Sequence, residues 1–175
     1  MHKALFLDRD GVINVEKDYL YKKEDFEFVD GILELCRHYQ SLGYLIIVVT
    51  NQSGIARGYY SEEDFSYLSQ WMIDEFLQHG ISISKVYHCP HHPDISGKCE
   101  CRKPNPGMLE EAHKEFDIDM RHSLMIGDKE RDIESALNAG IVETYLFDED
   151  GEIHDSKANK IVRKLEQIWK KNADT

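Results

Sequence analysis

The stretch Leu5-Phe6-Leu7-Asp8-Arg9-Asp10-Gly11 decides how the rest of the chain can be interpreted. Its apolar residues are typical of a buried parallel strand, and two carboxylates follow directly where that strand ends. Because residues two apart on an extended chain face the same way, Asp8 and Asp10 converge on one spot, and Gly11 lets the backbone turn away. Two carboxylates held that close stay ionised only if a cation lies between them or one of them takes up a proton. The stretch therefore predicts a site of ion binding or proton transfer.

The Asp-x-Asp-Gly pattern also has two simpler interpretations. Asp and Gly are ordinary turn residues, so the stretch alone fits a polar turn after a strand. A calcium-binding loop of the EF-hand kind opens in the same way, but it needs glycine and a bidentate Glu at positions where this chain has Ile13 and Tyr19. The EF-hand interpretation fails, and the choice between a turn and a catalytic site depends on the rest of the chain.

The composition suits a single domain that spans residues 1–175. A chain of 175 residues can bury a full core but leaves little room for a second domain. The formal net charge of −12 argues against a nucleic acid as partner, because a nucleic-acid-binding surface needs clustered Lys and Arg. The apolar run after Met1-His2-Lys3 is too short for a secretory signal, and no stretch reaches membrane-spanning length. We therefore expect a cytoplasmic protein with no membrane partner.

The remaining chain alternates between helical and strand patterns. An irregular segment, whose pattern allows a short hairpin, runs to Phe28, and the proline-rich and cysteine-rich segment from Cys89 to Pro106 is expected to hold no regular element. Ser61 followed by Asp64 resembles a capping box at the start of a helix. The expected helices are 30–42, 61–79, 107–116, 130–139 and 160–171, and the expected strands are 5–7, 44–50, 85–88, 123–126 and 143–147.

Strands that alternate with helices in this way indicate an α/β fold with a doubly wound parallel sheet. Because the crossovers are right-handed, the chain must start centrally and wind outward both ways, which predicts the strand order 3-2-1-4-5. Ligands of such sheets bind outside the carboxyl ends of the strands where the winding reverses, here between the first and fourth strands. Asp8 stands at one of these two ends and Asp128 at the other.

The same edge of the sheet collects further polar side chains. Thr50 ends the second strand, and Arg102 and Lys103 follow the third. The oxygens of Asp8, Asp10 and Asp128 suit Mg²⁺, which keeps several waters and leaves room for a phosphate oxygen. Taken singly, each of these residues has an ordinary role, such as a surface lysine or a helix cap. Their joint arrangement instead predicts magnesium-dependent phosphate chemistry.

The cysteines indicate a metal rather than disulfides. Cys36 lies alone in a helical pattern and is expected to be a small core residue. Disulfides are disfavoured in the cytosol, so we expect none. A segment that carries Cys89, Cys99 and Cys101 together with neighbouring histidines is typical of a four-coordinate zinc site, and from spacing alone His91 and His92 are equal candidates for the fourth ligand. Four protein ligands close such a site, so this zinc loop (residues 89–101) is predicted to be structural and to present Arg102 and Lys103.

With these motifs in place, the chain resembles the haloacid dehalogenase (HAD) superfamily of phosphotransferases. Its four motifs match Asp8-x-Asp10, Thr50, Lys103 and Gly127-Asp128, in the same order and over roughly the whole chain. The resemblance implies that Asp8 attacks phosphorus to form an aspartyl-phosphate, and that Asp10 protonates the leaving alcohol and later deprotonates water. It also implies that Asp8, Asp128 and the main-chain carbonyl of Asp10 hold Mg²⁺, while Thr50 and Lys103 bind the phosphoryl oxygens.

Within the superfamily, the chain is most similar to the D-glycero-D-manno-heptose 1,7-bisphosphate 7-phosphatase family, which serves nucleotide-heptose synthesis for bacterial surface polysaccharides such as lipopolysaccharide. The resemblance rests on the segments 8–14, 50–58, 89–93, 101–104 and 127–129. It implies a monomer, and it favours His91 over His92 as the zinc ligand. The segments after Asp10 and between the third strand and Lys103, where many superfamily members carry cap domains, are short here, so we expect no cap domain. The residues it places against the sugar bisphosphate are Glu16, Lys17, Asp18, Tyr19, Asn51, Gln52, Ser53, Arg57 and Arg102. The chain departs from the family in a shortened stretch between His92 and Cys99 and in Val12, where Thr is frequent.

Two alternatives remain open. The histidinol-phosphate phosphatases of histidine synthesis share the fold, the catalytic motif and the zinc loop. The run Ser53-Gly54-Ile55-Ala56-Arg57-Gly58 favours the heptose enzymes, since a second phosphate gives Arg57 or Arg102 a group to bind, whereas a cationic amine would be drawn to Glu16 and Asp18. A zinc-stabilised binding module without chemistry is a more distant alternative, because it predicts a missing nucleophile, acid or lysine.

Overall fold

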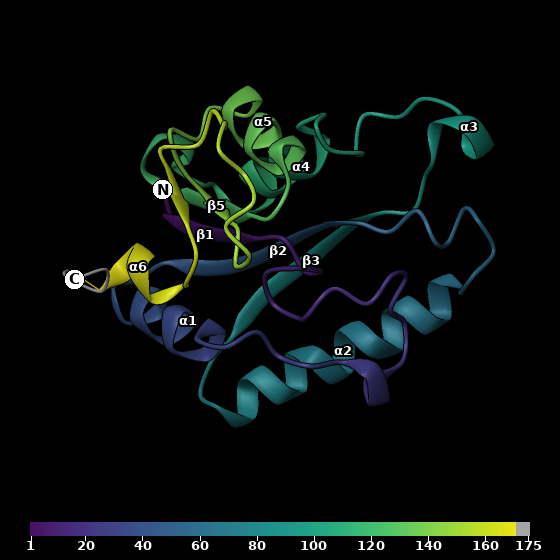
Figure 1. Ribbon diagram of the computed structural model, residues 1–175, viewed down its shortest axis with the longest axis horizontal. Helices are drawn as coiled ribbons and strands as arrows, with labels where there is room; N and C mark the ends of the chain where they lie inside the picture. Colours follow the sequence, from purple (N-terminus) through teal and green to yellow (C-terminus); the bar gives the residue numbers. More distant parts are fainter. Residues whose placement is uncertain (171–175) are drawn as a thin grey trace.

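Among residues 1–170, which the computed structural model describes, six parallel strands form one sheet in the order β3-β2-β1-β4-β5-β6 (Figure 1). The strands are β1 Ala4–Leu7, β2 Leu45–Asn51, β3 Ile83–Cys89, β4 Leu124–Gly127, β5 Glu143–Phe147 and β6 Lys160–Val162. β1 pairs with β2 on one side and with β4 on the other. The chain thus starts at the centre of the sheet and winds outward in both directions.

The helices of the described chain are α1 Ile32–Ser41, α2 Glu62–Gln78, α3 Pro93–Ser96, α4 Gly107–Phe116, α5 Glu130–Asn138 and α6 Glu166–Trp169, with 3₁₀ turns η1 Lys23–Asp25 and η2 Met120–His122. The predicted capping box at the start of α2 is present, because Ser61 accepts from the backbone of Asp64 and Asp64 accepts from the backbone of Ser61. None of the helices within residues 1–170 has both the length and the apolar composition that a membrane crossing needs.

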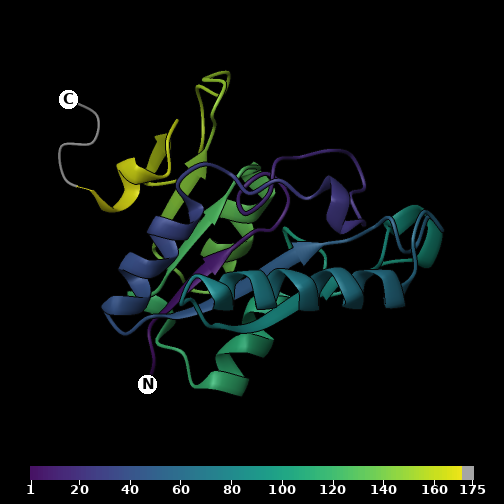
Figure 2. The same cartoon turned by 90° about the horizontal axis from the view of Figure 1, so that it is seen from below.

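The sheet has an apolar core on each face, and the central strand contributes to both. Leu5 and Leu7 belong to the cluster that α1 and α2 cover, whereas Ala4 and Phe6 belong to the cluster under α4 and α5. This alternation follows from the period of two along a strand, and burial on both faces explains why β1 is apolar throughout. Figures 1 and 2 show the two helical layers on opposite sides of the sheet.

The predicted α/β class and the order of the first five strands are confirmed, but two predicted segments are wrong. The expected helix over 160–171 is instead the edge strand β6 followed by the short α6, and Lys171 lies outside the described residues. The segment from Cys89 to Pro106 was expected to be irregular, yet it contains the single helical turn α3. His92 caps this turn with its side chain, and Pro93 occupies the first turn, where its missing N–H costs nothing.

Candidate active site

Three carboxylates meet at the carboxyl edge of the sheet. Asp8 follows β1, Asp128 follows β4, and Asp132 lies in the first turn of α5, and one ligand atom of each lies within 4.8 Å of the others. Gly11 is required beside them, because its φ of +88° is left-handed and a Cβ there would lie 2.1 Å from Oδ2 of Asp128. The tight turn after β1 therefore brings the backbone of this segment against the carboxylate of Asp128.

Lys103 is the buried cation of this cluster. Its side chain is 2% exposed, and its Nζ lies 3.0 Å from Oδ1 of Asp8 and 2.7 Å from Oδ1 of Asp132. The same Nζ donates hydrogen bonds to Oδ1 of Asp8 and to the carbonyl of Val49 at 2.9 Å, while its contact with Asp132 is an ion pair. Asn51 holds the backbone of Lys103, because its Oδ1 accepts from the Lys103 amide at 3.0 Å.

The electrostatics of the cluster show a surplus of negative charge. Burial raises the pKa of Asp8 well above its usual value, and the Asp132 carboxylate raises it further, while Lys103 acts in the opposite direction. The pKa of Asp128 is also raised, first by burial and then by Asp132. Burial alone would lower the pKa of Lys103, but the carboxylates of Asp132 and Asp8 outweigh it and the pKa is raised. Carboxylate oxygens at this density suit a divalent cation.

The side chain of Asp10 has a different environment. Nη2 of Arg9 lies 3.0 Å from its Oδ1 and 3.2 Å from its Oδ2, and the Arg9 side chain is 1% exposed. Asn14 Nδ2 donates to Oδ1 at 3.0 Å, and Gln52 Nε2 donates to Oδ2 at 3.0 Å. Asp10 is thus held by three side chains while its neighbour Asp8 faces the lysine and the other carboxylates.

A cavity of about 260 Å³ opens over these groups and has charged walls of both signs. Burial raises the pKa of Glu16 on one wall, and the Asp10 carboxylate raises it further. Burial lowers the pKa of Arg102 on another wall, and the guanidinium groups of Arg131 and Arg57 lower it further. The lining consists of Asp8, Asp10, Glu16, Asp18, Tyr19, Asn51, Gln52, Ser53, Arg57, Tyr60, Arg102, Lys103, Asp128, Lys129 and Arg131.

Most of the predicted catalytic and substrate-binding residues therefore surround one cavity. Two of them do not line it. Thr50 is buried beneath the cavity, where its Oγ1 accepts from Gln52 at 2.9 Å. Lys17 turns toward Glu27, whose carboxylate lies 4.0 Å from its ammonium.

The sequence analysis missed several residues of this site. Asp132 is the most important of them, because it forms an ion pair with Lys103 and its Oδ2 accepts hydrogen bonds from the backbone N–H groups of Asp128 and Lys129. The available signal was an acidic residue at the third position of the predicted helix, where its side chain can accept backbone N–H groups at the helix start. Tyr60 and Arg131 had no comparable signal, because only the folded chain brings them to the cavity.

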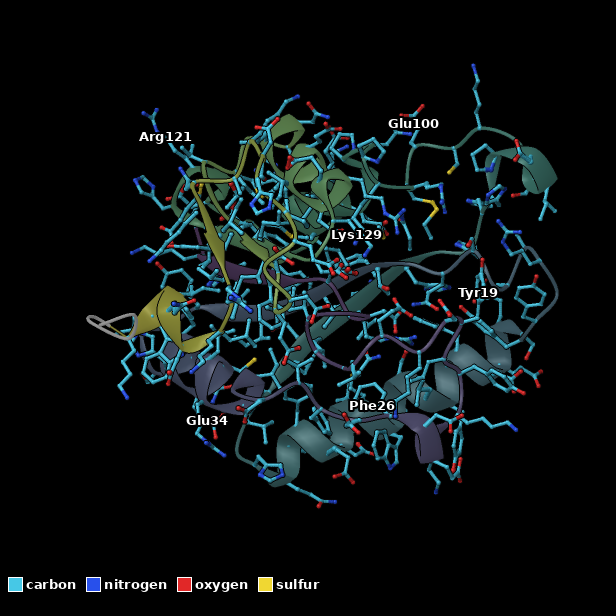
Figure 3. All side chains as sticks on the ribbon, in the orientation of Figure 1. Tyr19, Phe26, Glu34, Glu100, Arg121 and Lys129 are labelled. Carbon is cyan, nitrogen blue, oxygen red and sulfur yellow. A yellow bond between two sulfur atoms is a disulfide. The ribbon has the colours of Figure 1, made fainter. Side chains whose placement is uncertain are left out.

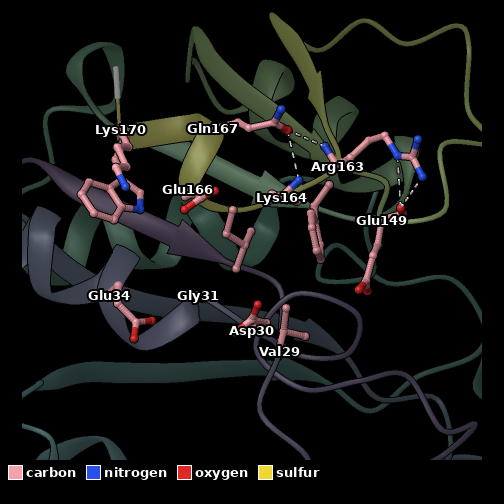
Figure 4. A pocket seen from close by; sticks show the side chains of 13 residues that line it. Val29, Asp30, Gly31, Glu34, Glu149, Arg163, Lys164, Glu166, Gln167 and Lys170 are labelled. Atoms are coloured by element: carbon pink, nitrogen blue, oxygen red, sulfur yellow. Dashed lines mark hydrogen bonds between the residues drawn. The ribbon is translucent and has the colours of Figure 1, made fainter. Parts of the chain in front are cut away.

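A second cavity, of about 760 Å³, lies between the start of α1 and the segment that contains α6 (Figure 4). Its charged side chains are of both signs, and several are bound by the chain itself. The Arg163 guanidinium donates to the carbonyl of Glu149, and Gln167 accepts from the backbone of Arg163 and Lys164. The carboxylate cluster lies elsewhere, so we place the chemistry in the smaller cavity.

The predicted zinc ligands come together after β3. The ligand atoms of Cys89, His91, Cys99 and Cys101 all lie within 4.8 Å of one another, with Nδ1 of His91 3.5 Å from Sγ of Cys89 and 3.3 Å from Sγ of Cys101. His92 is not part of the group, since its Nδ1 accepts from the backbone of Asp94. The donor set fits zinc.

The expectation that the cysteines form no disulfide is wrong for one pair. Cys89 and Cys101 are joined in the structure, and the yellow sulfur–sulfur bond is visible in Figure 3 beside the loop that leads from α3 to α4. Both residues belong to the zinc ligand set, so zinc binding requires them to be reduced to thiolates. Cys36 is a buried free cysteine, as predicted.

Comparisons with known proteins identify the family to which the chain belongs. A family model described as HAD-hydrolase-like matches residues 100–160. A D-glycero-alpha-D-manno-heptose-1,7-bisphosphate 7-phosphatase of Campylobacter jejuni is 56% identical over 148 residues, which cover 85% of this chain and 84% of that protein. A D-glycero-beta-D-manno-heptose-1,7-bisphosphate 7-phosphatase of Helicobacter pylori is 48% identical over 147 residues, which cover 83% of this chain and 84% of that protein.

A solved structure shows a similar fold with ligands present. The D,D-heptose 1,7-bisphosphate phosphatase of B. bronchiseptica, complexed with magnesium and phosphate, superposes with a TM-score of 0.82 at 27% identity and covers 95% of both chains. Proteins that share only a fold can have much lower sequence identity than the 56% and 48% found for these two curated relatives, which match more than four fifths of this chain. The chain belongs to the family of D-glycero-D-manno-heptose-1,7-bisphosphate 7-phosphatases, within the HAD-like hydrolases.

Proposed function

We propose that the protein hydrolyses the 7-phosphate of D-glycero-D-manno-heptose 1,7-bisphosphate, a step in the synthesis of nucleotide-activated heptose. The observation that carries the proposal is the ion pair of Asp8 and Lys103, which lies at the edge of the sheet beneath a cavity lined by further cations. A carboxylate next to a buried lysine can attack a phosphate group whose negative charge the lysine holds. The names of the curated relatives supply the substrate.

The reaction would proceed in two displacements at phosphorus. A carboxylate oxygen of Asp8 forms a bond to phosphorus, the bond between phosphorus and the ester oxygen breaks, and Asp10 gives its proton to the departing alkoxide. Asp10 then takes a proton from water, the resulting hydroxide attacks phosphorus, and the bond to Asp8 breaks to release inorganic phosphate. Lys103 and the hydroxyl of Thr50 hold the phosphoryl oxygens during both displacements.

Residues of the carboxylate cluster would hold the magnesium ion. The side chains of Asp8 and Asp128 and the main-chain carbonyl of Asp10 are its predicted ligands, and the raised pKa values of Asp8 and Asp128 reflect a charge surplus that a cation relieves. When bound, Mg²⁺ supplies positive charge to the phosphate group. Asp132 lies near enough to these ligands to fix Asp128 through its backbone.

The arginines that line the cavity favour a substrate with a second anionic group. Arg102 has its pKa lowered by burial and by the neighbouring guanidinium groups of Arg131 and Arg57, so these cations repel one another until an anion joins them. A sugar bisphosphate provides such an anion, whereas histidinol phosphate would bring a cationic amine. The curated relatives also favour the heptose substrate over histidinol phosphate.

We also propose that Cys89, His91, Cys99 and Cys101 bind a structural zinc ion when the cysteines are reduced. The compact ligand group supports this proposal. The loop is connected to the substrate cavity, because the Arg102 guanidinium donates to the carbonyl of His91 at 3.4 Å. Zinc would therefore stabilise the position of Arg102.

Phosphorus NMR of the reaction mixture tests the proposed substrate and its site of cleavage. We expect magnesium-dependent release of inorganic phosphate with the anomeric phosphate retained in the sugar product, and no release by Asp8→Asn. Loss of the anomeric phosphate instead, or full activity of Asp8→Asn, would contradict the proposal. That the enzyme works as a monomer in the cytoplasm stays a prediction, and sedimentation of the purified protein checks its monomeric state.

A further inference from the structure

Gln52 occupies the turn after β2, where the resemblance predicts a contact with substrate, yet its main partners are catalytic side chains. Its side chain is 2% exposed, and its Nε2 donates to Oδ2 of Asp10 at 3.0 Å and to Oγ1 of Thr50 at 2.9 Å. Both protons of the amide are therefore used. One amide contacts the proposed general acid and the proposed phosphate-binding hydroxyl at the same time.

The orientation of this amide determines whether these contacts exist. A carboxylate offers only acceptor atoms, so a flipped amide would place Oε1 of Gln52 against Oδ2 of Asp10 and lose that contact. The hydroxyl of Tyr60 donates to Oε1 of Gln52 and so favours the observed orientation. If Nε2 faced Tyr60 instead, the hydroxyl would lose its acceptor.

Tyr60 is itself held in place from several sides. It is 6% exposed, its ring stacks on that of Tyr21 with centroids 5.6 Å apart, and a Cβ on Gly54 would lie 2.2 Å from its Cε1. The capping box of α2 begins at the next residue, Ser61, and fixes the backbone there. Burial raises the pKa of Tyr60 to about 12, so its hydroxyl keeps the proton that it donates.

We propose that Tyr60 is a positioning residue that acts through Gln52 on both Asp10 and Thr50. Because Oγ1 of Thr50 accepts from Gln52, its own proton remains to be donated. In the structure this proton goes to the carbonyl of Asn51 in a long contact of 3.4 Å, which a phosphoryl oxygen would replace. Because Gln52 fixes one oxygen of Asp10, the carboxyl group keeps the orientation in which it can protonate the leaving alkoxide. The inference rests on the proposed role of Asp10 as general acid.

The leaving group of the substrate distinguishes this role from a merely structural one. A sugar alkoxide needs a proton as it departs, whereas p-nitrophenolate departs readily without one. We expect Tyr60→Phe to lower kcat/KM about 10-fold for heptose 1,7-bisphosphate but no more than about 3-fold for p-nitrophenyl phosphate, with KM for the sugar nearly unchanged. Asp10→Asn should show the same contrast between the two esters with a larger loss on the sugar.

A double-mutant cycle tests the route through Gln52. If Tyr60 acts through that amide, Tyr60→Phe should cause no further loss of kcat/KM in a Gln52→Leu background. Tyr21→Phe is the matched control, since it removes a hydroxyl from the other ring of the stacked pair, and we expect wild-type kinetics. Circular dichroism and thermal unfolding of each variant show whether the fold is retained.

Three results would overturn the inference. They are equal losses of Tyr60→Phe on both esters, no loss on either, and a loss that adds to that of Gln52→Leu. If Asp10→Asn fails to distinguish the two esters, the general acid assignment and this inference are both wrong. If the wild-type enzyme prefers another sugar phosphate or histidinol phosphate, only the proposed substrate is refuted. The role of Tyr60 can then be tested by comparing kcat/KM for that preferred alkyl phosphate with kcat/KM for p-nitrophenyl phosphate.

Discussion

Lys103→Met should lower both the stability of the protein and its activity. The substitution keeps the length of the side chain but removes a buried ammonium that lies 3.0 Å from Asp8 and 2.7 Å from Asp132. Loss of one partner from a buried ion pair destabilises a protein by about 3–5 kcal/mol, because the other charge is left without compensation. At this chain length, about 3 kcal/mol corresponds to a fall in Tm of about 10 °C. Loss of a charged donor to the phosphoryl group should lower kcat by about 10²–10³-fold.

The size of the stability loss should depend on pH. The pKa of Lys103 is higher in the folded than in the unfolded state, so its stabilising effect is fully present below the unfolded pKa and is lost as pH rises through the folded pKa. Without Lys103, the pKa of Asp8 rises further, since Lys103 is the cation that lowers it. Because the carboxylate of Asp8 takes up a proton more readily as pH falls, we expect Lys103→Met to be less destabilising at pH 5 than at pH 8.

Urea unfolding in EDTA, repeated at the two pH values, measures these effects, and phosphate release measures the catalytic loss. Lys129→Met is the matched control for stability, because Lys129 is 55% exposed and pairs with Asp128 at 3.5 Å. Such an exposed pair contributes less than about 1 kcal/mol. If Lys103→Met is as stable in EDTA as Lys129→Met, the charge balance that we describe for the carboxylate cluster is wrong.

Three further predictions concern the metal sites and Asp132. Asp8 and Asp128 have folded pKa values above their usual value, so their ionisation destabilises the fold as pH rises. The free energy of unfolding in EDTA should therefore fall as pH rises above the ordinary pKa of Asp, and Mg²⁺ should abolish that fall. A stability that rises with pH in EDTA would contradict the sign. Metal analysis of reduced Cys99→Ser should find that the zinc is lost. Because Arg102 is hydrogen-bonded to the zinc loop, this variant should raise KM for the sugar more than it lowers kcat. An unchanged zinc content would contradict the ligand assignment. Asp132→Ala should lower magnesium affinity about 10-fold or more, because the backbone N–H of Asp128 loses its acceptor. The Mg²⁺ dependence of phosphate release measures this affinity, and an unchanged value would refute the role of Asp132 in positioning Asp128.

The strand order could be predicted because it depends on few choices. Once the chain alternates between strands and helices, right-handed crossovers leave few ways to build the sheet, and apolar runs such as Leu5–Leu7 locate the strands. Short elements lack that constraint. The strand β6 has three residues, too few to show a period, and the charged and apolar residues around it also fit a helix.

The candidate site was predictable where the strand ends determine it. Asp8, Thr50 and Asp128 follow from the rule that the carboxyl ends of parallel strands share one edge. The role of Gln52 was not predictable in the same way, because its contacts with Asp10 and Tyr60 depend on how the turn after β2 folds over the site. Side chains that act on other side chains leave no spacing pattern in a sequence.

The most direct test of the account compares kcat/KM for magnesium-dependent phosphate release from the α and β anomers of heptose 1,7-bisphosphate and from histidinol phosphate. Relatives named for each anomer are similar to this chain, so both anomers are needed. We predict a clear preference for one heptose anomer over the other and over histidinol phosphate. A preference for histidinol phosphate would contradict the proposed substrate and the role that we give to Arg57 and Arg102.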